Sequence, residues 1–179
     1  ALCATLKRAL REPWAPARPG VDFAENETAW VRWHAAQTWR AAVQSNQPKP
    51  LAAKPAISVI VTHYNRPALL DECLAALSAQ DYDNFDVIVV DDGSPSSAAQ
   101  RYLDSLEPAF KQRGWQIIRQ KNAYLGAARN NGVRHSRGEY IVFVDDDDLP
   151  RPDKLSTYAA VAARTHADIL TCCNDYFAV

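Results

Sequence analysis

The sequence predicts an α/β fold with a mostly parallel sheet, and two features of residues 57–172 carry this prediction. Short runs of β-branched and other apolar residues recur along this segment, and stretches with helical periodicity separate them. Runs that are apolar throughout are typical of strands covered on both faces, as in parallel sheets. Their alternation with helices indicates right-handed crossover connections. In chain order, the predicted strands are 57–62, 85–90, 115–119, 139–144 and 167–172.

The segments between the strands carry signals of helix starts and of an apolar helical face. Pro67 suits the first turn of a helix, where a missing N–H costs no hydrogen bond inside the helix. Ser94 is predicted to cap the next helix, with Pro95 as its first residue. The predicted helices are 67–80, 94–110, 124–136 and 152–166.

The first 56 residues differ in composition from the rest of the chain. The 26–45 segment contains three tryptophans at helical spacing, and we expect a helix whose apolar face packs on the following domain or on a neighbouring one. Three prolines in 46–56 are typical of an extended linker. We therefore divide the chain into an N-terminal extension with a Trp-rich helix (1–45), a Pro-rich linker (46–56) and an α/β domain (57–179).

Composition and charge exclude several classes of protein. The chain has 179 residues, with 20 Lys and Arg against 21 Asp and Glu, so its formal net charge is −1. This balance argues against a broad surface for nucleic acid or for an anionic membrane. No apolar run approaches the roughly 20 residues that span a bilayer. Four cysteines without CxxC spacing indicate reduced thiols in a cytoplasmic protein.

Three clusters of polar residues directly follow predicted strands. They are 62–65 after the first strand, 91–94 after the second and 145–148 after the fourth. The carboxyl ends of parallel strands share one edge, and ligands of open α/β sheets bind there, where the strand order reverses. If the strand order is 3-2-1-4, the three clusters meet in one crevice.

The third cluster is a run of four aspartates, Asp145 to Asp148, directly after an apolar strand. Four neighbouring carboxylates repel one another, and Mg²⁺ or Mn²⁺, which prefer oxygen ligands, would offset that repulsion. In extended backbone Asp145 and Asp147 would share a face. A solvated acidic loop is the alternative. We expect a site for a metal ion and a diphosphate.

The other clusters offer groups that suit a nucleotide. Asp91 and Asp92 can accept hydrogen bonds from a base N–H or a ribose hydroxyl. Tyr64 can stack on a nucleobase or pack at the rim of the sheet, and Arg129 can face a diphosphate or pair with an aspartate. His63 alternates with its neighbours, so we expect it to point elsewhere and assign it no role.

Taken together, these segments resemble the family 2 glycosyltransferases with the GT-A fold, from about Ile57 to Val179. The resemblance implies an inverting transfer of a sugar from a nucleotide donor, often a UDP-sugar, to the hydroxyl of a glycan or other acceptor. The segments that carry it are ISVIVTHYNRP, FDVIVVDDGSP, the N-x-x-x-G-x-x-R-N pattern of 122–130, and RGEYIVFVDDDDLPRPDKL.

The resemblance also implies roles for individual residues. Asp147 would be the principal ligand of Mn²⁺ or Mg²⁺, with Asp145 near the ribose and diphosphate as the second ligand of this DXD motif. Asp92 would bind the base. The implied nucleotide-sugar contacts are Thr62, Tyr64, Asp91, Asp92, Arg129, Asn130, Asp145 and Asp146.

Two departures from the family pattern shape the remaining expectations. Tyr124 stands where many relatives have glycine, so we expect the loop after the third strand to differ. The family's catalytic base follows the aspartate motif at a distance, and we expect it beyond Val179 in a longer enzyme of polysaccharide biosynthesis. We therefore expect this chain to be the inactive donor half of that enzyme. A non-catalytic nucleotide-sugar-binding or scaffold module is the alternative.

Two other classes fit the same alternation of strands and helices less well. A phosphoacceptor receiver domain needs an acidic pair after the first strand, where this chain has His63, Tyr64 and Asn65. Nucleotidyl transfer on a related sheet favours a Gly-rich, basic loop at that place, which 65–67 does not supply.

Overall fold

The structure is a computed structural model, and it describes residues 54–165, 167, 169 and 170. All of these residues belong to the compact unit Leu51–Val179. The predicted N-terminal extension, its Trp-rich helix and most of the linker lie outside the described residues. Among the described helices, none is long and apolar enough to cross a membrane.

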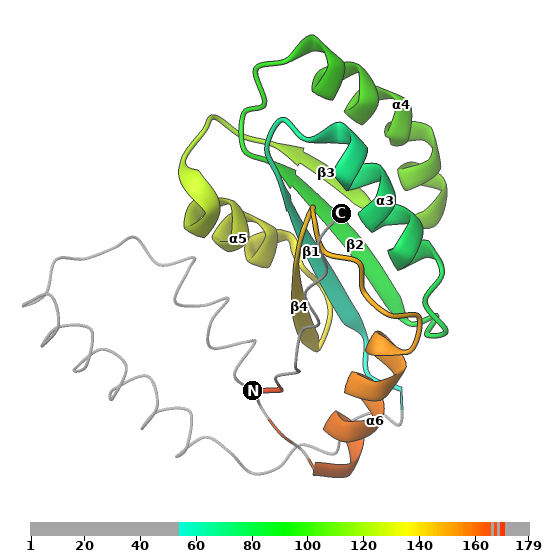
Figure 1. Cartoon of the computed structure of the whole chain (residues 1–179). Helices are drawn as coiled ribbons and strands as arrows, with labels where there is room; N and C mark the ends of the chain where they lie inside the picture. The colour runs from blue at the N-terminus through cyan, green and yellow to red at the C-terminus, as the bar shows by residue number, and fades with distance from the viewer. Residues whose placement is uncertain (1–53, 166, 168, 171–179) are drawn as a thin grey trace, which may run out of the picture. The chain divides into compact units, whose positions relative to one another are not determined.

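Four parallel strands form one sheet in the order β3-β2-β1-β4, which is the order under which the three polar clusters meet (Figure 1). Each of these strands begins and ends within one residue of its prediction. The predicted fifth strand is described only at residues 167, 169 and 170, none of which lies in a strand. The strands are β1 (Ile57–His63), β2 (Phe85–Asp91), β3 (Gln116–Arg119) and β4 (Tyr140–Asp145).

Four helices connect or follow the strands. They are α3 (Pro67–Ser78), α4 (Ser97–Arg113), α5 (Tyr124–His135) and α6 (Lys154–Thr165).

The start of α4 differs from the prediction. Ser96 caps this helix, because its hydroxyl accepts a hydrogen bond from the Ala99 N–H at 3.1 Å. Ser94 does not cap the helix, since its hydroxyl donates to the Asp91 carboxylate. The turn that closes on Asp91 therefore delays the helix beyond Pro95.

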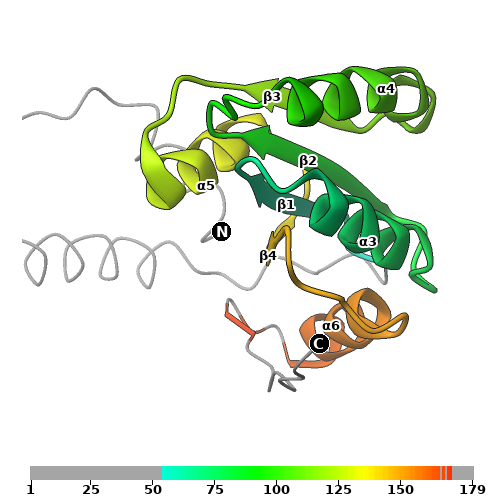
Figure 2. The same ribbon diagram turned by 45° about the horizontal axis from the view of Figure 1, so that its top comes forward.

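The helices cover both faces of the sheet, with α3 and α4 on one face and α5 on the other (Figures 1 and 2). Alternation along β1 explains this arrangement. Val59 and Val61 join the core that α3 contributes to, and Ile60 faces α5. At Gly132 of α5 an added Cβ would lie 2.4 Å from Ile60 Cγ2, so only glycine allows this close approach.

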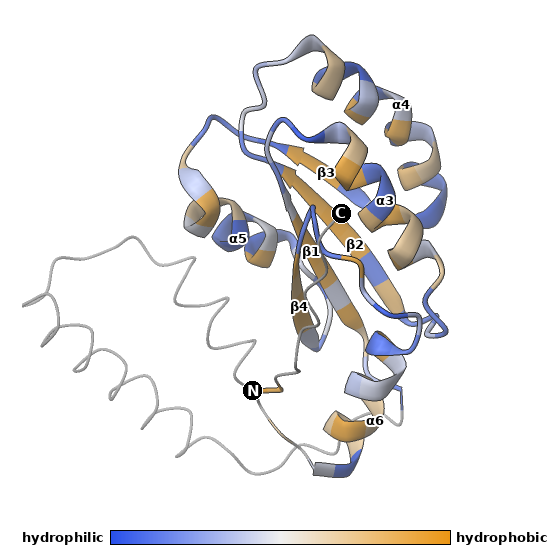
Figure 3. Cartoon of the chain, in the orientation of Figure 1, coloured by the Kyte–Doolittle hydropathy of each residue, from blue (hydrophilic) through white to orange (hydrophobic). Residues whose placement is uncertain are grey.

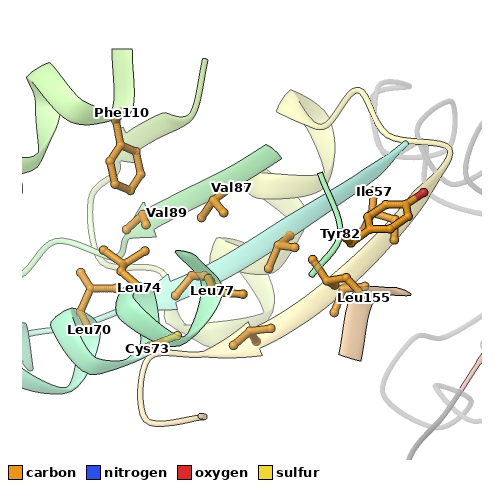
Figure 4. Close-up of a cluster of buried hydrophobic side chains, with 14 of the residues drawn as sticks. Ile57, Leu70, Cys73, Leu74, Leu77, Tyr82, Val87, Val89, Phe110 and Leu155 are labelled. Carbon is orange, nitrogen blue, oxygen red and sulfur yellow. The ribbon is translucent and has the colours of Figure 1, made fainter. Parts of the chain in front are cut away.

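The main core lies between the sheet and α3, α4 and α6. Figure 4 shows the leucines of α3 gathered beside Val87 and Val89 of β2. Leu155 of α6 joins the same cluster and is 1% exposed. Figure 3 shows apolar strands and a strongly hydrophilic segment directly after β4. This core holds the ends of β1, β2 and β4 in fixed register, and the polar clusters follow those ends.

Candidate functional site

The three polar clusters meet at the carboxyl edge of the sheet, as the sequence predicts. Thr62 on β1 is in register with Asp145 on β4, and His63 is in register with Asp91 on β2. The backbone continues this pairing past the strand, because the Asp92 N–H donates to the His63 carbonyl at 2.9 Å. Residues more than 80 positions apart in the sequence thus lie side by side.

Asp145 accepts hydrogen bonds from both flanking elements. Thr62 donates its hydroxyl to Asp145 Oδ1 at 3.0 Å, and Arg129 Nη2 contacts the two carboxylate oxygens at 2.8 and 3.1 Å. The Arg129 guanidinium also lies 5.6 Å from the centre of the Phe143 ring. Of the two roles considered for Arg129, the structure shows the ion pair with an aspartate.

Asp146 is fully buried and has a different set of partners. Its Oδ2 lies 2.7 Å from His63 Nδ1, and its Oδ1 accepts from Arg66 Nη2. The sequence assigns His63 no role, and the structure places its ring against Asp146. Alternation turns His63 away from Thr62, and Asp146, the first residue after β4, meets it there. The predicted contact of Asp146 with a donor stays a prediction.

Asp147 and Asp148 lie in the turn that follows β4. Arg66 Nη1 donates to Asp147 Oδ2 at 2.8 Å, and Asp148 Oδ2 accepts from the Asp145 N–H at 3.1 Å. The extended backbone that would place Asp145 and Asp147 on one face ends at Asp145. In the described part of the chain, no group of three or more His, Cys, Asp or Glu residues is arranged to hold a metal ion. Two guanidinium groups, those of Arg66 and Arg129, pair with three of the four carboxylates, and Asp148 is held by a backbone N–H.

The aspartates after β2 accept hydrogen bonds from neutral groups. Asp91 is 1% exposed and accepts from the backbone and hydroxyl of Ser94 and from Gln100 Nε2. Asp92 Oδ1 accepts from Gln120 Nε2 at 2.7 Å and from the Ala123 N–H at 2.8 Å. These bonds hold the loops after β2 and β3 together.

Gly93 completes this arrangement of loops. Its φ is +76°, and an added Cβ would lie 2.7 Å from the Asn122 backbone nitrogen. Both facts require glycine here.

Two tyrosines and an asparagine lie on the exposed side of the edge. Tyr64 is 48% exposed, and Tyr124 is 81% exposed with a φ of +67°. A bulky residue at positive φ is uncommon. The expectation that the loop after the third strand departs from the family pattern stays a prediction. Asn130 is exposed on α5.

The pKa values of two side chains close to the acidic run, Cys73 and Arg66, are raised. Burial raises the pKa of the Cys73 thiol to about 12, and the carboxylates of residues 146–148 act in the same direction. Cys73 is thus a buried, neutral thiol, as expected from the cysteine pattern. For Arg66, partial burial lowers the pKa, but attraction by Asp146 and Asp147 outweighs it and raises the pKa overall.

Sequence reasoning missed the residues that hold the aspartates. Arg66, Gln100 and Gln120 each donate to a carboxylate of the site. Arg66 directly follows the first polar cluster, and that position is the one signal that could have singled it out. Nothing in the sequence distinguishes Gln100 or Gln120 from ordinary surface residues.

Comparisons with known proteins agree with this geometry. The family model described as glycosyl transferase family 2 matches residues 58–178. A putative glycosyltransferase, EpsH of Bacillus subtilis, is 38% identical over 125 residues, covering 67% of this chain and 33% of EpsH. The putative colanic acid biosynthesis glycosyl transferase WcaA of Escherichia coli is 34% identical over 125 residues, covering 68% of this chain and 43% of WcaA.

A solved structure shares the fold as well. S. aureus TarS 1–349 in complex with UDP-GlcNAc has a TM-score of 0.56 and 30% sequence identity, covering 63% of this chain and 32% of TarS 1–349. The chain spans about a third of the length of EpsH and of TarS 1–349, and less than half of WcaA.

Proposed function

The chain belongs to glycosyl transferase family 2, and we propose that its α/β domain binds the nucleotide-sugar donor of a glycosyl transfer reaction. The observation that carries the proposal is the convergence of three polar clusters at one edge of a sheet whose order reverses between β1 and β4. The similarity to TarS, whose solved complex contains UDP-GlcNAc, supports a UDP-sugar as the donor.

The nucleoside is proposed to lie over the ends of β1 and β2. Tyr64 exposes 48% of its surface there, and an exposed aromatic ring offers a stacking face for a base. The hydrogen bonds from Gln120 and from the Ala123 N–H both reach Asp92 Oδ1, so Oδ2 is the oxygen that we propose for the base. Asp91 is proposed to act indirectly, because its carboxylate already holds the turn at Ser94.

The diphosphate is proposed to lie over the end of β4. Asp147 and Asp145 would hold a divalent cation, Mn²⁺ or Mg²⁺, which when bound neutralises the charge that builds on the leaving diphosphate. Their hard carboxylate oxygens fit such an ion, and each carboxylate already faces a cationic nitrogen at 2.8 Å. Arg129 lies beside Asp145 and would add a second positive charge there.

The reaction is proposed to proceed by direct displacement with inversion. An acceptor hydroxyl attacks the anomeric carbon, the bond from that carbon to the phosphate oxygen breaks, and the hydroxyl proton passes to a base. We place that base, the acceptor site and any neighbouring modules outside the described residues. The acceptor is proposed to be a glycan or other hydroxyl compound in cytoplasmic polysaccharide synthesis, which the similarity to WcaA supports.

Calorimetric titration of the chain with UDP, with and without Mn²⁺, tests the donor site. We expect binding that Mn²⁺ strengthens and that Asp147→Asn weakens to the metal-free level. Asp153→Asn is the matched control, because Asp153 is an exposed aspartate nearby in sequence that pairs with Arg151. If the folded chain binds no UDP, the donor-site proposal fails. If Asp147→Asn keeps the full effect of Mn²⁺, the metal assignment fails.

A further inference from the structure

Arg66 bridges two of the four aspartates through separate nitrogens. Its Nη1 donates to Asp147 Oδ2 at 2.8 Å, and its Nη2 donates to Asp146 Oδ1. Arg66 is the residue directly before α3, so the start of that helix positions its backbone. One guanidinium thus joins a carboxylate at the surface to a carboxylate in the interior.

The two arms of this bridge differ in exposure. The side chains of Arg66 and Asp147 are each 47% exposed, whereas that of Asp146 is 0% exposed. Exposed ion pairs contribute little, because water and salt screen them, but losing a partner of a buried charge is costly. The arm to Asp147 therefore opens more readily than the arm to Asp146.

His63 holds Asp146 from the opposite side. Its Nδ1 lies 2.7 Å from Asp146 Oδ2, and both side chains are 0% exposed. An ionised carboxylate only accepts hydrogen bonds, so this contact places the imidazole proton on Nδ1. Each oxygen of Asp146 then has its own donor, and rotation of the carboxylate would break both bonds. Asp146 is a fixed anchor for Arg66.

Arg129 holds Asp145 in a different way. It uses one nitrogen, Nη2, for both oxygens of that carboxylate, at 2.8 and 3.1 Å. Its Nε is buried and has no hydrogen-bond partner among the described residues. Releasing Asp145 would therefore cost Arg129 its carboxylate contact altogether, whereas Arg66 can release Asp147 and stay on Asp146.

We propose that Arg66 is a displaceable counter-cation of Asp147, which a divalent cation replaces at Nη1 while Nη2 keeps the side chain on Asp146. This inference rests on the proposed function, because it takes Asp147 as a metal ligand. Arg66 then offsets the charge of Asp146 and Asp147 in part while no ion is bound, and it competes with the ion for the Asp147 carboxylate. It is a positioning residue that lowers the affinity of the free domain for divalent cations.

Electron paramagnetic resonance of free Mn²⁺ in titrations of the full chain, without nucleotide, tests this proposal. We expect Arg66→Gln to raise the Mn²⁺ affinity about two- to fivefold, the worth of one exposed ion pair. A variant that merely damaged the site would lower it. Arg119→Gln is the matched control, since Arg119 also bridges two carboxylates, those of Asp104 and Glu107. It should leave the Mn²⁺ affinity unchanged.

The double variant Arg66→Gln/Asp146→Asn separates direct competition from a general charge effect. It removes one positive and one negative charge, and it leaves no buried carboxylate without its partner. The rise in Mn²⁺ affinity should persist in this variant if Arg66 competes for Asp147. Loss of the rise would overturn the proposal. Circular dichroism checks the fold, and the double variant carries the test if Arg66→Gln alone does not fold.

The variant Asp147→Asn distinguishes a failure of the proposed role of Arg66 from a failure of the metal assignment to Asp147. If it weakens Mn²⁺ binding while the folded Arg66 variants bind as the wild type does, the role of Arg66 is overturned and the metal assignment stands. If it leaves Mn²⁺ affinity unchanged, the metal assignment itself fails, and the inference on Arg66 fails with it.

Discussion

The aspartates that follow β2 and β4 look alike in sequence but are held by different kinds of partner. Asp91 and Asp92 are buried and accept hydrogen bonds from amides, a hydroxyl and backbone N–H groups. Asp145 and Asp147 are partly exposed and pair with guanidinium groups. Neutral donors from neighbouring loops fix the shape of a turn, whereas a half-exposed ion pair can exchange its cation. The hydrogen bonds to the first pair fix the loops after β2 and β3, whereas the second pair is suited to exchange its cations.

Asp146 is buried like the first pair and contacts a guanidinium like the second. Of the changes considered, removal of one of its partners should lower the free energy of unfolding most. His63→Ala would leave one oxygen of a fully buried carboxylate without its donor. We expect the free energy of unfolding to fall by about 3–5 kcal/mol, measured by urea denaturation. Tyr64→Ala is the control, because this half-exposed neighbour should cost under about 1 kcal/mol. A loss under about 1 kcal/mol for His63→Ala would mean that Asp146 needs no buried partner.

Replacing each carboxylate by its amide tests the comparison directly. In Asp91→Asn the new NH₂ group would face donors at Ser94 and Gln100, so we expect stability to fall by about 1–3 kcal/mol. Asp147→Asn removes only an exposed ion pair and should cost under about 1 kcal/mol. Thermal and urea denaturation of both variants give the difference. If both variants lost the same free energy of unfolding, the distinction between aspartates that fix loops and aspartates that exchange cations would be wrong.

Two glycines test how tightly the loops held by Asp91 and Asp92 pack. Gly93 and Gly114 both have positive φ, but only Gly93 has neighbours within 4 Å of an added Cβ. We expect Gly114→Ala to cost about 1–2 kcal/mol for its backbone conformation. Gly93→Ala should cost at least about 1 kcal/mol more, because the loop after β3 must also move. If the two variants unfold at the same urea concentration, the loops do not pack as tightly as the structure shows.

Most of the fold could be predicted from local patterns. Apolar runs and helical periodicity place β1 to β4 within one residue, and β1 and β2, which are buried along most of their length, give the clearest continuous apolar segments. The start of α4 could not be predicted in this way. Two serines, Ser94 and Ser96, each suit a cap, and the contact of Ser94 with Asp91 decides between them.

The candidate site was predictable as a place but only partly as a set of contacts. Residues at the ends of β1, β2 and β4 must share an edge once the strands are parallel, so the meeting of the three clusters follows from the order of elements. Their partners do not follow from that order. His63 illustrates the limit. Its alternation along β1 can be read from the sequence, but its contact with Asp146, beyond the end of β4, cannot.

The sequence by itself thus determined the alternation of strands and helices, the residues at each strand end and the membership in glycosyl transferase family 2. These depend on periodicity and on short motifs, which are local properties of the chain. Only the tertiary structure decided which cation or amide each aspartate meets. His63 and Asp146 are 83 positions apart, and Arg66 and Asp147 are 81 apart. Such contacts depend on strand register and side-chain packing, which no local pattern records.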